Sequence, residues 1–206
     1  MTDYFALLNE PRRPWSDPDS LKAKFLALSA EMHPDRAHGE SETTKRVAHE
    51  RYTELNSAYN CLREPKDRLL HLLQLESGKK PKEVQEIPPV AVELFLEVAR
   101  VCREVDLFLA RGATVTSPLL KVQVFERSQE WTDELNALQQ QINSRRDELL
   151  EDLKEMDTGW EKVAGAGAAE RQQSLPLDRL EQVYRALSFV ARWTSQIQER
   201  VVQLAF

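Results

Sequence analysis

The residues with the clearest chemical potential are His33, Pro34 and Asp35, which stand together between two stretches of helical character. An imidazole and a carboxylate can both form charge-assisted hydrogen bonds, and the proline between them restricts the backbone that presents them. Because proline biases the preceding residue away from helical geometry, we expect the first helix to end at about Met32. The tripeptide is therefore predicted to lie at the tip of a turn, displayed to a partner. The alternative is an ordinary loop in which Asp35 caps the next segment.

Two helices must hold this turn. The pair Asp17-Pro18 is a typical helix start, because an N-cap carboxylate accepts from free first-turn amides and proline suits the first helical position. The apolar residues of this helix recur at spacings of three and four and form one stripe: Leu21, Phe25, Leu28 and Met32. A second helix is predicted over residues 41–62. A short helix at residues 3–8 precedes the pair, and a fourth helix begins at Pro65.

The chain changes character after residues 77–89, where three prolines and a glycine predict a linker. Beyond it, apolar residues repeat in heptads along three long segments, with breaks at residues 112–117 and 165–176. We predict an all-α fold with a helical hairpin domain at 1–76 and an antiparallel three-helix bundle at 90–206. A coiled-coil dimer is the alternative, but the short connections favour a monomer that folds back within one chain.

Composition excludes several classes of function. A net charge of −6 and a pI near 5.4 argue against nucleic acid as a partner. No apolar run approaches the roughly 18 residues of a membrane span, and the N-terminus has no secretion signal, so a cytoplasmic protein with free Cys61 and Cys102 is expected. The sequence has no phosphate loop, nucleophile elbow or acid–base pair. We therefore expect no enzyme activity, and the spacing of the histidines predicts no metal and no cofactor.

Several segments together resemble a J-domain over residues 1–76. They are Tyr4-Phe5 in the short helix, the His33-Pro34-Asp35 turn, and residues 62–65 (LREP). Residues 3–8 (DYFALL), 55–59 (LNSAY) and 69–75 (LLHLLQL), together with Arg68 and the following bundle, are similar to the HscB branch of that family. HscB proteins are co-chaperones of iron–sulfur cluster assembly. The chain has no N-terminal cysteine segment of the eukaryotic kind, so it resembles the bacterial form.

The resemblance implies a first partner, a heat-shock chaperone ATPase of the HscA or DnaK type whose ATP hydrolysis the J-domain stimulates. The residues implied in chaperone binding are His33, Pro34, Asp35, Arg36, Lys22 and Lys24. For the two lysines and Arg36, the alternative is a solvated helix face. J-domains usually carry several bases just before the tripeptide, whereas residues 29–32 here read SAEM.

The resemblance implies a second partner, an IscU-like scaffold protein bound on the first helix of the bundle. The implied scaffold-binding residues are Phe95, Leu96, Glu97, Ala99, Arg100, Arg103 and Glu104. The heptad seam takes Leu94, Val98, Val101 and Val105, which leaves an apolar patch to the side. The alternative is that this patch packs against the third bundle helix or the J-domain. The family tends to have acids where Arg100 and Arg103 stand. A J-protein with an unrelated client, or a helical dimerising protein with a degenerate J-domain, therefore stays open.

Overall fold

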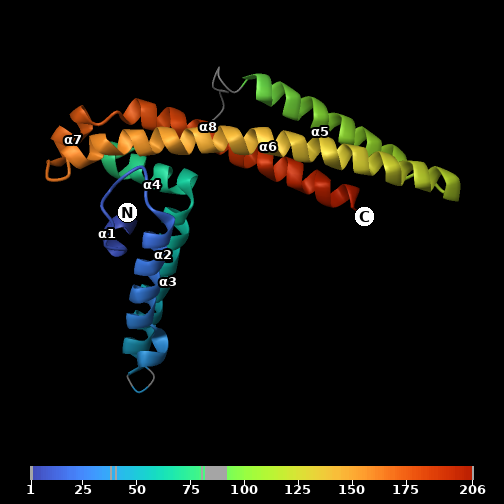
Figure 1. Cartoon of the computed structure of the whole chain (residues 1–206). Helices are drawn as coiled ribbons and strands as arrows, with labels where there is room; N and C mark the ends of the chain where they lie inside the picture. The colour runs from blue at the N-terminus through green and yellow to red at the C-terminus, as the bar shows by residue number, and fades with distance from the viewer. Residues whose placement is uncertain (1, 38, 40, 80, 82–91, 206) are drawn as a thin grey trace. The chain divides into compact units, whose positions relative to one another are not determined.

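The structure is a computed structural model that describes residues 2–37, 39, 41–79, 81 and 92–205 (Figure 1). Its elements are α1 (Tyr4–Leu7), α2 (Pro18–Glu31), the 3-10 turn η1 (Pro34–Ala37), α3 (Glu42–Arg63), α4 (Pro65–Ser77), α5 (Val92–Gly112), α6 (Pro118–Lys162), α7 (Ala168–Ser174) and α8 (Leu177–Leu204). Every regular element in these ranges is helical, which confirms the predicted all-α class. Within the same ranges, no helix combines the length and the apolarity needed to cross a membrane.

The predicted helix starts are confirmed by their side-chain caps. The Asp3 carboxylate accepts from the amides of Phe5 and Ala6 at 3.0 and 3.3 Å and so caps α1. Asp17 accepts from the Ser20 amide at 2.8 Å at the start of α2. Such caps satisfy amides that have no partner within the helix, and each contributes about 1 kcal/mol.

The chain forms two compact units that do not follow its order in sequence. The first unit combines Met1–Lys82 with Leu150–Tyr184, and the second combines Glu83–Leu149 with Arg185–Phe206. Helices α6 and α8 therefore contribute residues to both units. The predicted domain boundaries at 76 and 90 remain predictions. Most of the predicted linker, residues 80 and 82–89, lies outside the described residues.

The first unit is built on the hairpin of α2 and α3. The rings of Phe25 and Tyr59 stack with centroids 4.1 Å apart, and Leu21 and Leu55 are fully buried. Arg68 of α4 is also buried and donates to the backbone carbonyls of Pro14 and Leu62 at 3.0 and 2.7 Å. Burial lowers the pKa of Arg68 to about 10, so it stays charged at neutral pH and holds the segment before α2 against the end of α3.

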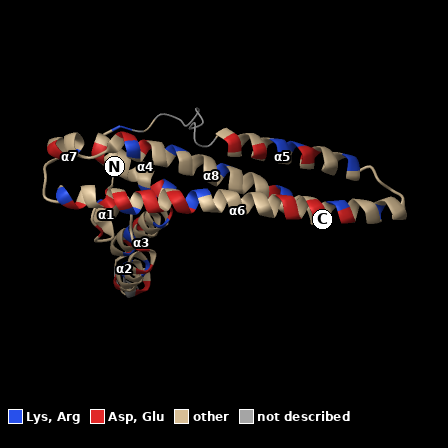
Figure 2. Cartoon of the chain, turned by 45° about the horizontal axis from the view of Figure 1, so that its top comes forward, with Lys and Arg blue, Asp and Glu red and all other residues tan. Residues whose placement is uncertain are grey.

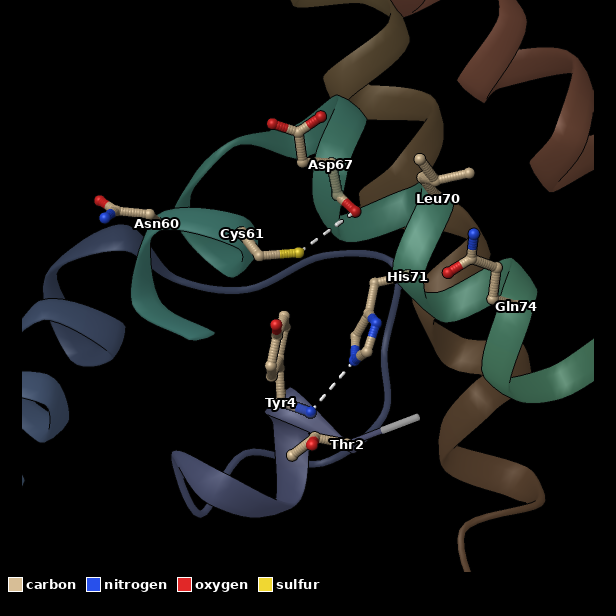
Figure 3. Close-up of a pocket in the computed structure, with 8 residues that line it drawn as sticks. All are labelled: Thr2, Tyr4, Asn60, Cys61, Asp67, Leu70, His71 and Gln74. Atoms are coloured by element: carbon tan, nitrogen blue, oxygen red, sulfur yellow. Dashed lines mark hydrogen bonds between the residues drawn. The ribbon is translucent and has the colours of Figure 1, made fainter. Parts of the chain in front are cut away.

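Helix α1 is attached to α4 through His71. The amide of Tyr4 donates to Nε2 of His71 at 3.1 Å, and the two rings stack with centroids 4.6 Å apart, beside an open pocket (Figure 3). Because Nε2 accepts this bond, the imidazole is neutral and carries its proton on Nδ1. Burial lowers the pKa of His71 below its ordinary value of 6.5, while the Asp3 carboxylate opposes that shift.

The His71 contact makes the stability of the first unit depend on pH. Below about pH 6.5 the unfolded chain binds a proton at this histidine more readily than the folded chain does, so we expect the free energy of unfolding to fall as pH drops. One histidine contributes a slope of at most about 1.4 kcal/mol per pH unit. Urea unfolding between pH 5 and 7.5 measures it, and His71→Gln is expected to flatten the curve. The exposed His49→Gln is the control and should leave the slope unchanged; an equal effect of both variants would contradict the assignment.

A buried ion pair joins α7 to α4 within the first unit. Arg171 of α7 forms a two-pronged bond with the Glu76 carboxylate of α4, with Nε at 2.9 Å from Oε2. Its Nη1 also donates to the carbonyl of Val163 at 2.9 Å. The hydrogen bonds to Glu76 raise the pKa of Arg171, so its guanidinium stays charged.

The second unit is a bundle of α5 with parts of α6 and α8. The heptad prediction is confirmed for most of the seam, whose buried residues in this unit include Val98, Val101, Val105, Leu135, Leu138, Ile142, Leu187, Val190, Ile197 and Leu204. The predicted seam residues Leu94 and Phe108 of α5 are only half-buried. Side-chain bonds connect all three helices: Arg100 to Glu134 at 3.2 Å, Gln139 to Thr194 at 3.1 Å, and Arg200 to Asp106 at 2.7 Å. At the end of α5, a Cβ on Gly112 would lie 3.3 Å from the Val124 side chain, so glycine permits the close approach of α6.

Candidate functional sites

The His33-Pro34-Asp35 turn lies at the end of the α2–α3 hairpin. Helix α2 ends at Glu31 with Met32 as its C-cap, as proline at position 34 predicts, and η1 begins at Pro34. Nδ1 of His33 accepts from the Asp35 amide at 3.3 Å, and the ring meets Tyr52 of α3 edge-on at 5.4 Å. This bond places the imidazole proton on Nε2, on the opposite side of the ring. The Asp35 side chain is 91% exposed and its carboxylate is open to a cationic group on a partner.

The cations predicted to accompany this turn differ in their surroundings. Lys24 is engaged within the chain, because its ammonium lies 2.8 Å from the Glu10 carboxylate and 3.3 Å from the carbonyl of Asn9. Lys22 is exposed and forms no ion pair with any described residue. Arg36 belongs to η1, but its side chain falls outside the described part of the structure. Of the two described lysines, Lys22 is therefore the one with an uncompensated charge.

The outward side of α2 is apolar. Ala23, Leu26, Ala27 and Ala30 are all exposed, with Leu26 at 55%, and they share one face at helical spacing. Small and aliphatic side chains thus form this exposed surface of α2. A partner that contacts this face would gain from apolar burial rather than from many ion pairs.

The residues predicted to bind a scaffold divide between two sides of α5. Phe95, Ala99 and Arg103 line a groove of about 260 Å³ between α5 and α8, and the Phe95 ring lies 6.5 Å from that of Trp193. Leu96 is 60% exposed outside the groove. The remaining predicted residues are on or near the α6 side.

On that side Arg100 binds Glu104 at 3.1 Å and Glu134 of α6 at 3.2 Å, and Glu97 is half-buried. Acidic and basic residues both occur along α5, as Figure 2 shows. The structure therefore brings Phe95, Ala99 and Arg103 together and ties Arg100 and Glu104 into a separate ion-pair network.

Sequence reasoning missed the α8 side of the groove. Trp193, Gln196 and Arg200 line it at spacings of three and four residues, opposite Phe95 and Arg103. Their spacing places them on one face of a helix next to the seam. The heptad pattern could not say which turn of α8 faces which turn of α5, so this signal was not sufficient.

The two cysteine thiols are free, and their surroundings favour the protonated form. Burial raises the pKa of Cys61 to about 11, and its Sγ donates to the carbonyl of Asp67 at 3.5 Å. Burial also raises the pKa of Cys102. Both thiols are therefore protonated at neutral pH. Among the described residues, no three His, Cys, Asp or Glu side chains gather into a possible metal site.

An exposed His-Pro-Asp turn on a helical hairpin, with a separate helical bundle, defines a J-domain protein. No protein-family model matches the chain. Curated relatives do match: the Co-chaperone protein HscB homolog of Chromobacterium violaceum is 40% identical over 81 residues, which are 39% of this chain and 46% of that protein. The homolog of Azoarcus sp. is 37% identical over 73 residues, 35% of this chain and 41% of the relative. The chain thus spans somewhat under half the length of the curated relatives it matches.

Solved structures extend the likeness of fold to almost the whole chain. HscB from Vibrio cholerae has a TM-score of 0.60 at 19% identity and covers 96% of each chain. The human co-chaperone protein HscB has a TM-score of 0.57 at 20% identity over 98% of this chain and 81% of the human one. The chain is thus similar in sequence to HscB co-chaperone homologs over part of its length, and it shares the fold of the solved HscB structures, a J-domain followed by a helical bundle.

Proposed function

We propose that the chain is a co-chaperone of iron–sulfur cluster assembly that stimulates the ATPase of a heat-shock chaperone of the HscA or DnaK type. The observation that carries this proposal is the exposed His33-Pro34-Asp35 turn, in which a bond to the Asp35 amide orients the His33 ring. The Asp35 carboxylate meets a cation of the chaperone in a charge-assisted bond, and Pro34 fixes the backbone between the two side chains. Hydrolysis takes place in the chaperone, so this chain has no catalytic activity of its own.

The same helix that carries the turn supplies the rest of the chaperone surface. Lys22, Lys24 and Arg36 contribute positive charge, while the apolar outward face of α2 contributes contact area. Because Lys24 already binds Glu10, its contribution to docking is smaller than that of Lys22. The protein acts in the cytoplasm of a bacterium as a monomer.

The second half of the proposal is delivery of an IscU-like scaffold, bound on α5. Phe95, Leu96 and Ala99 supply apolar surface, and the charged side chains around them, Glu97, Arg100, Arg103 and Glu104, fix the orientation of the partner. Exposed apolar side chains on a helix face support an interaction site, because a partner that covers them removes their apolar surface from water. The chaperone and the scaffold thus bind different helices of the chain.

A calorimetric titration with an IscU-type scaffold tests the second half. Saturable binding is expected, and changing Phe95→Ala and Leu96→Ala together should weaken it at least about tenfold, because truncating central apolar contacts typically costs more than 1 kcal/mol each. The control pair is Leu119→Ala with Val122→Ala on α6, where both side chains are also exposed, at 71% and 55%. Absence of binding, with ATPase stimulation intact, would leave a J-domain co-chaperone of a different client.

A further inference from the structure

One end of the second unit, residues 107–125, differs in composition from the rest of the chain. It consists of the last turns of α5, the connection to α6 and the first turns of α6. This segment contains nine large apolar residues, two bases and no acid, whereas the whole chain has a net charge of −6. We call it the bundle tip. Its residues lie outside both surfaces assigned above to the chaperone and the scaffold.

Helix α8 does not reach the bundle tip. Gln139 of α6 donates to the hydroxyl of Thr194 of α8 at 3.1 Å, and the two helices run antiparallel. Helix α8 continues to Leu204, about ten residues or ~15 Å beyond that bond, so it ends level with about Gln129 of α6. Figures 1 and 2 both show α5 and α6 extending past the end of α8. In the described chain, the first turns of α6 therefore pack against α5 but against no third helix.

Large apolar side chains are exposed on several sides of the bundle tip. On α6, Leu119 and Phe125 are 71% and 63% exposed, and Leu120 and Val122 are exposed as well. Because successive residues turn by about 100° around a helix, these four side chains cover more than half of its circumference. An amphipathic partner helix would cover only one side. A helix that is apolar on most sides is typically immersed in an apolar medium, either a protein core or a membrane.

The charge of the bundle tip is positive and uncompensated. Arg111 at the end of α5 and Lys121 on α6 are both exposed, and neither forms an ion pair with any described residue. The nearest acid before the tip, Asp106, is bound by Arg200 at 2.7 Å. A second copy of the chain, paired about a two-fold axis, would bring these bases against their own counterparts. A surface that carries negative charge is therefore the complementary partner.

We propose that the bundle tip binds reversibly to an anionic lipid surface. Leu119, Val122 and Phe125 enter the boundary between headgroups and acyl chains, and Arg111 and Lys121 meet the lipid phosphates. A lipid surface fits both observations, because it covers apolar side chains on several sides at once and supplies the negative charge. The contact is peripheral, since the apolar first turns of α6 are far shorter than the roughly 20 residues of a membrane span. It is independent of the proposed co-chaperone function.

The test is flotation of the full chain with vesicles made of equal parts of phosphatidylglycerol and phosphatidylcholine, compared with vesicles of phosphatidylcholine alone. Leu119→Gln together with Phe125→Gln removes apolar surface from the tip, and Lys121→Gln removes charge. The matched controls are Val202→Gln on α8, which is 56% exposed outside the tip, and Lys162→Gln, which is exposed at the other end of α6. All altered positions are exposed, so the variants should fold, and circular dichroism checks that they do.

The unaltered chain is expected to bind the mixed vesicles and to bind them less at high salt. The double variant should bind at least about tenfold more weakly, because burial of two large apolar side chains is lost. Lys121→Gln should bind the mixed vesicles about fivefold more weakly, as one base near an anionic surface contributes. The controls should bind like the unaltered chain.

Two results would overturn the inference. One is an unaltered chain that does not float with the mixed vesicles, or tip variants that bind them as well as the controls do. The other comes from sedimentation equilibrium without lipid: a mass that rises with concentration in the unaltered chain, and returns to that of a monomer in the double variant, would assign the tip to a second copy of the chain.

Discussion

Replacing His33 by glutamine is expected to reduce stimulation of the chaperone ATPase by at least about tenfold. The imidazole accepts from the Asp35 amide through Nδ1 and rests edge-on against Tyr52, so it both orders the turn and presents Nε2 outward. Glutamine keeps polar atoms but loses the planar ring and its fixed donor direction. A hydrogen bond to a charged group of the partner contributes about 1.5–3 kcal/mol, and its loss corresponds to a tenfold or larger loss of affinity.

The fold should not change in this variant, because the His33 side chain is 47% exposed and substitutions at such surface positions typically alter stability by less than about 0.5 kcal/mol. Steady-state ATPase assays with increasing amounts of the co-chaperone measure the effect, and thermal unfolding confirms the fold. His49→Gln is the matched control, an exposed histidine of α3 that should retain full stimulation. If His33→Gln stimulates as well as the unaltered chain, or the unaltered chain stimulates no chaperone, the J-domain activity proposed here is wrong.

The turn and its helices could be predicted because their signals are local. Asp17 and Pro18 determine the start of α2, and Pro34 determines its end within two residues, so the position of His33 and Asp35 follows from a short stretch of sequence. The buried seam of the bundle was likewise predictable, because heptad spacing fixes which side of each helix is covered.

Features that depend on residues distant in sequence could not be predicted. Helix α7 has seven residues, too few for a hydrophobic period, and it lies in a segment that the glycines and proline marked as a break. Its attachment to α4 through Arg171 and Glu76 joins positions 95 residues apart. The capture of Lys24 by Glu10 and the position of Trp193 opposite Phe95 are of the same kind. A single sequence shows which residues are apolar or charged, but not which of them meet.

The ion pair between Glu76 and Arg171 is expected to be the most sensitive point of the first unit's stability. The side chains are only 2% and 10% exposed, so removing one partner leaves the other charge buried without compensation. Arg171→Met is expected to reduce the free energy of unfolding by about 3–5 kcal/mol, which is typical when a buried pair is broken. It also deprives the Val163 carbonyl of its donor.

The double variant Glu76→Leu with Arg171→Met should be less destabilised than Arg171→Met alone, because no charge then remains buried. Urea unfolding followed by circular dichroism is measured for the unaltered chain, the two single variants and the double variant, which together form a double-mutant cycle. The coupling energy of this cycle separates the interaction between the two charges from the packing of the methylene groups. Arg179→Met is the control: its partner Asp152 lies 3.6 Å away, both side chains are about half exposed, and the expected loss is under about 1 kcal/mol. An equally small loss for Arg171→Met would mean that water reaches the Glu76 carboxylate and that the attachment of α7 to α4 depends on apolar contacts instead.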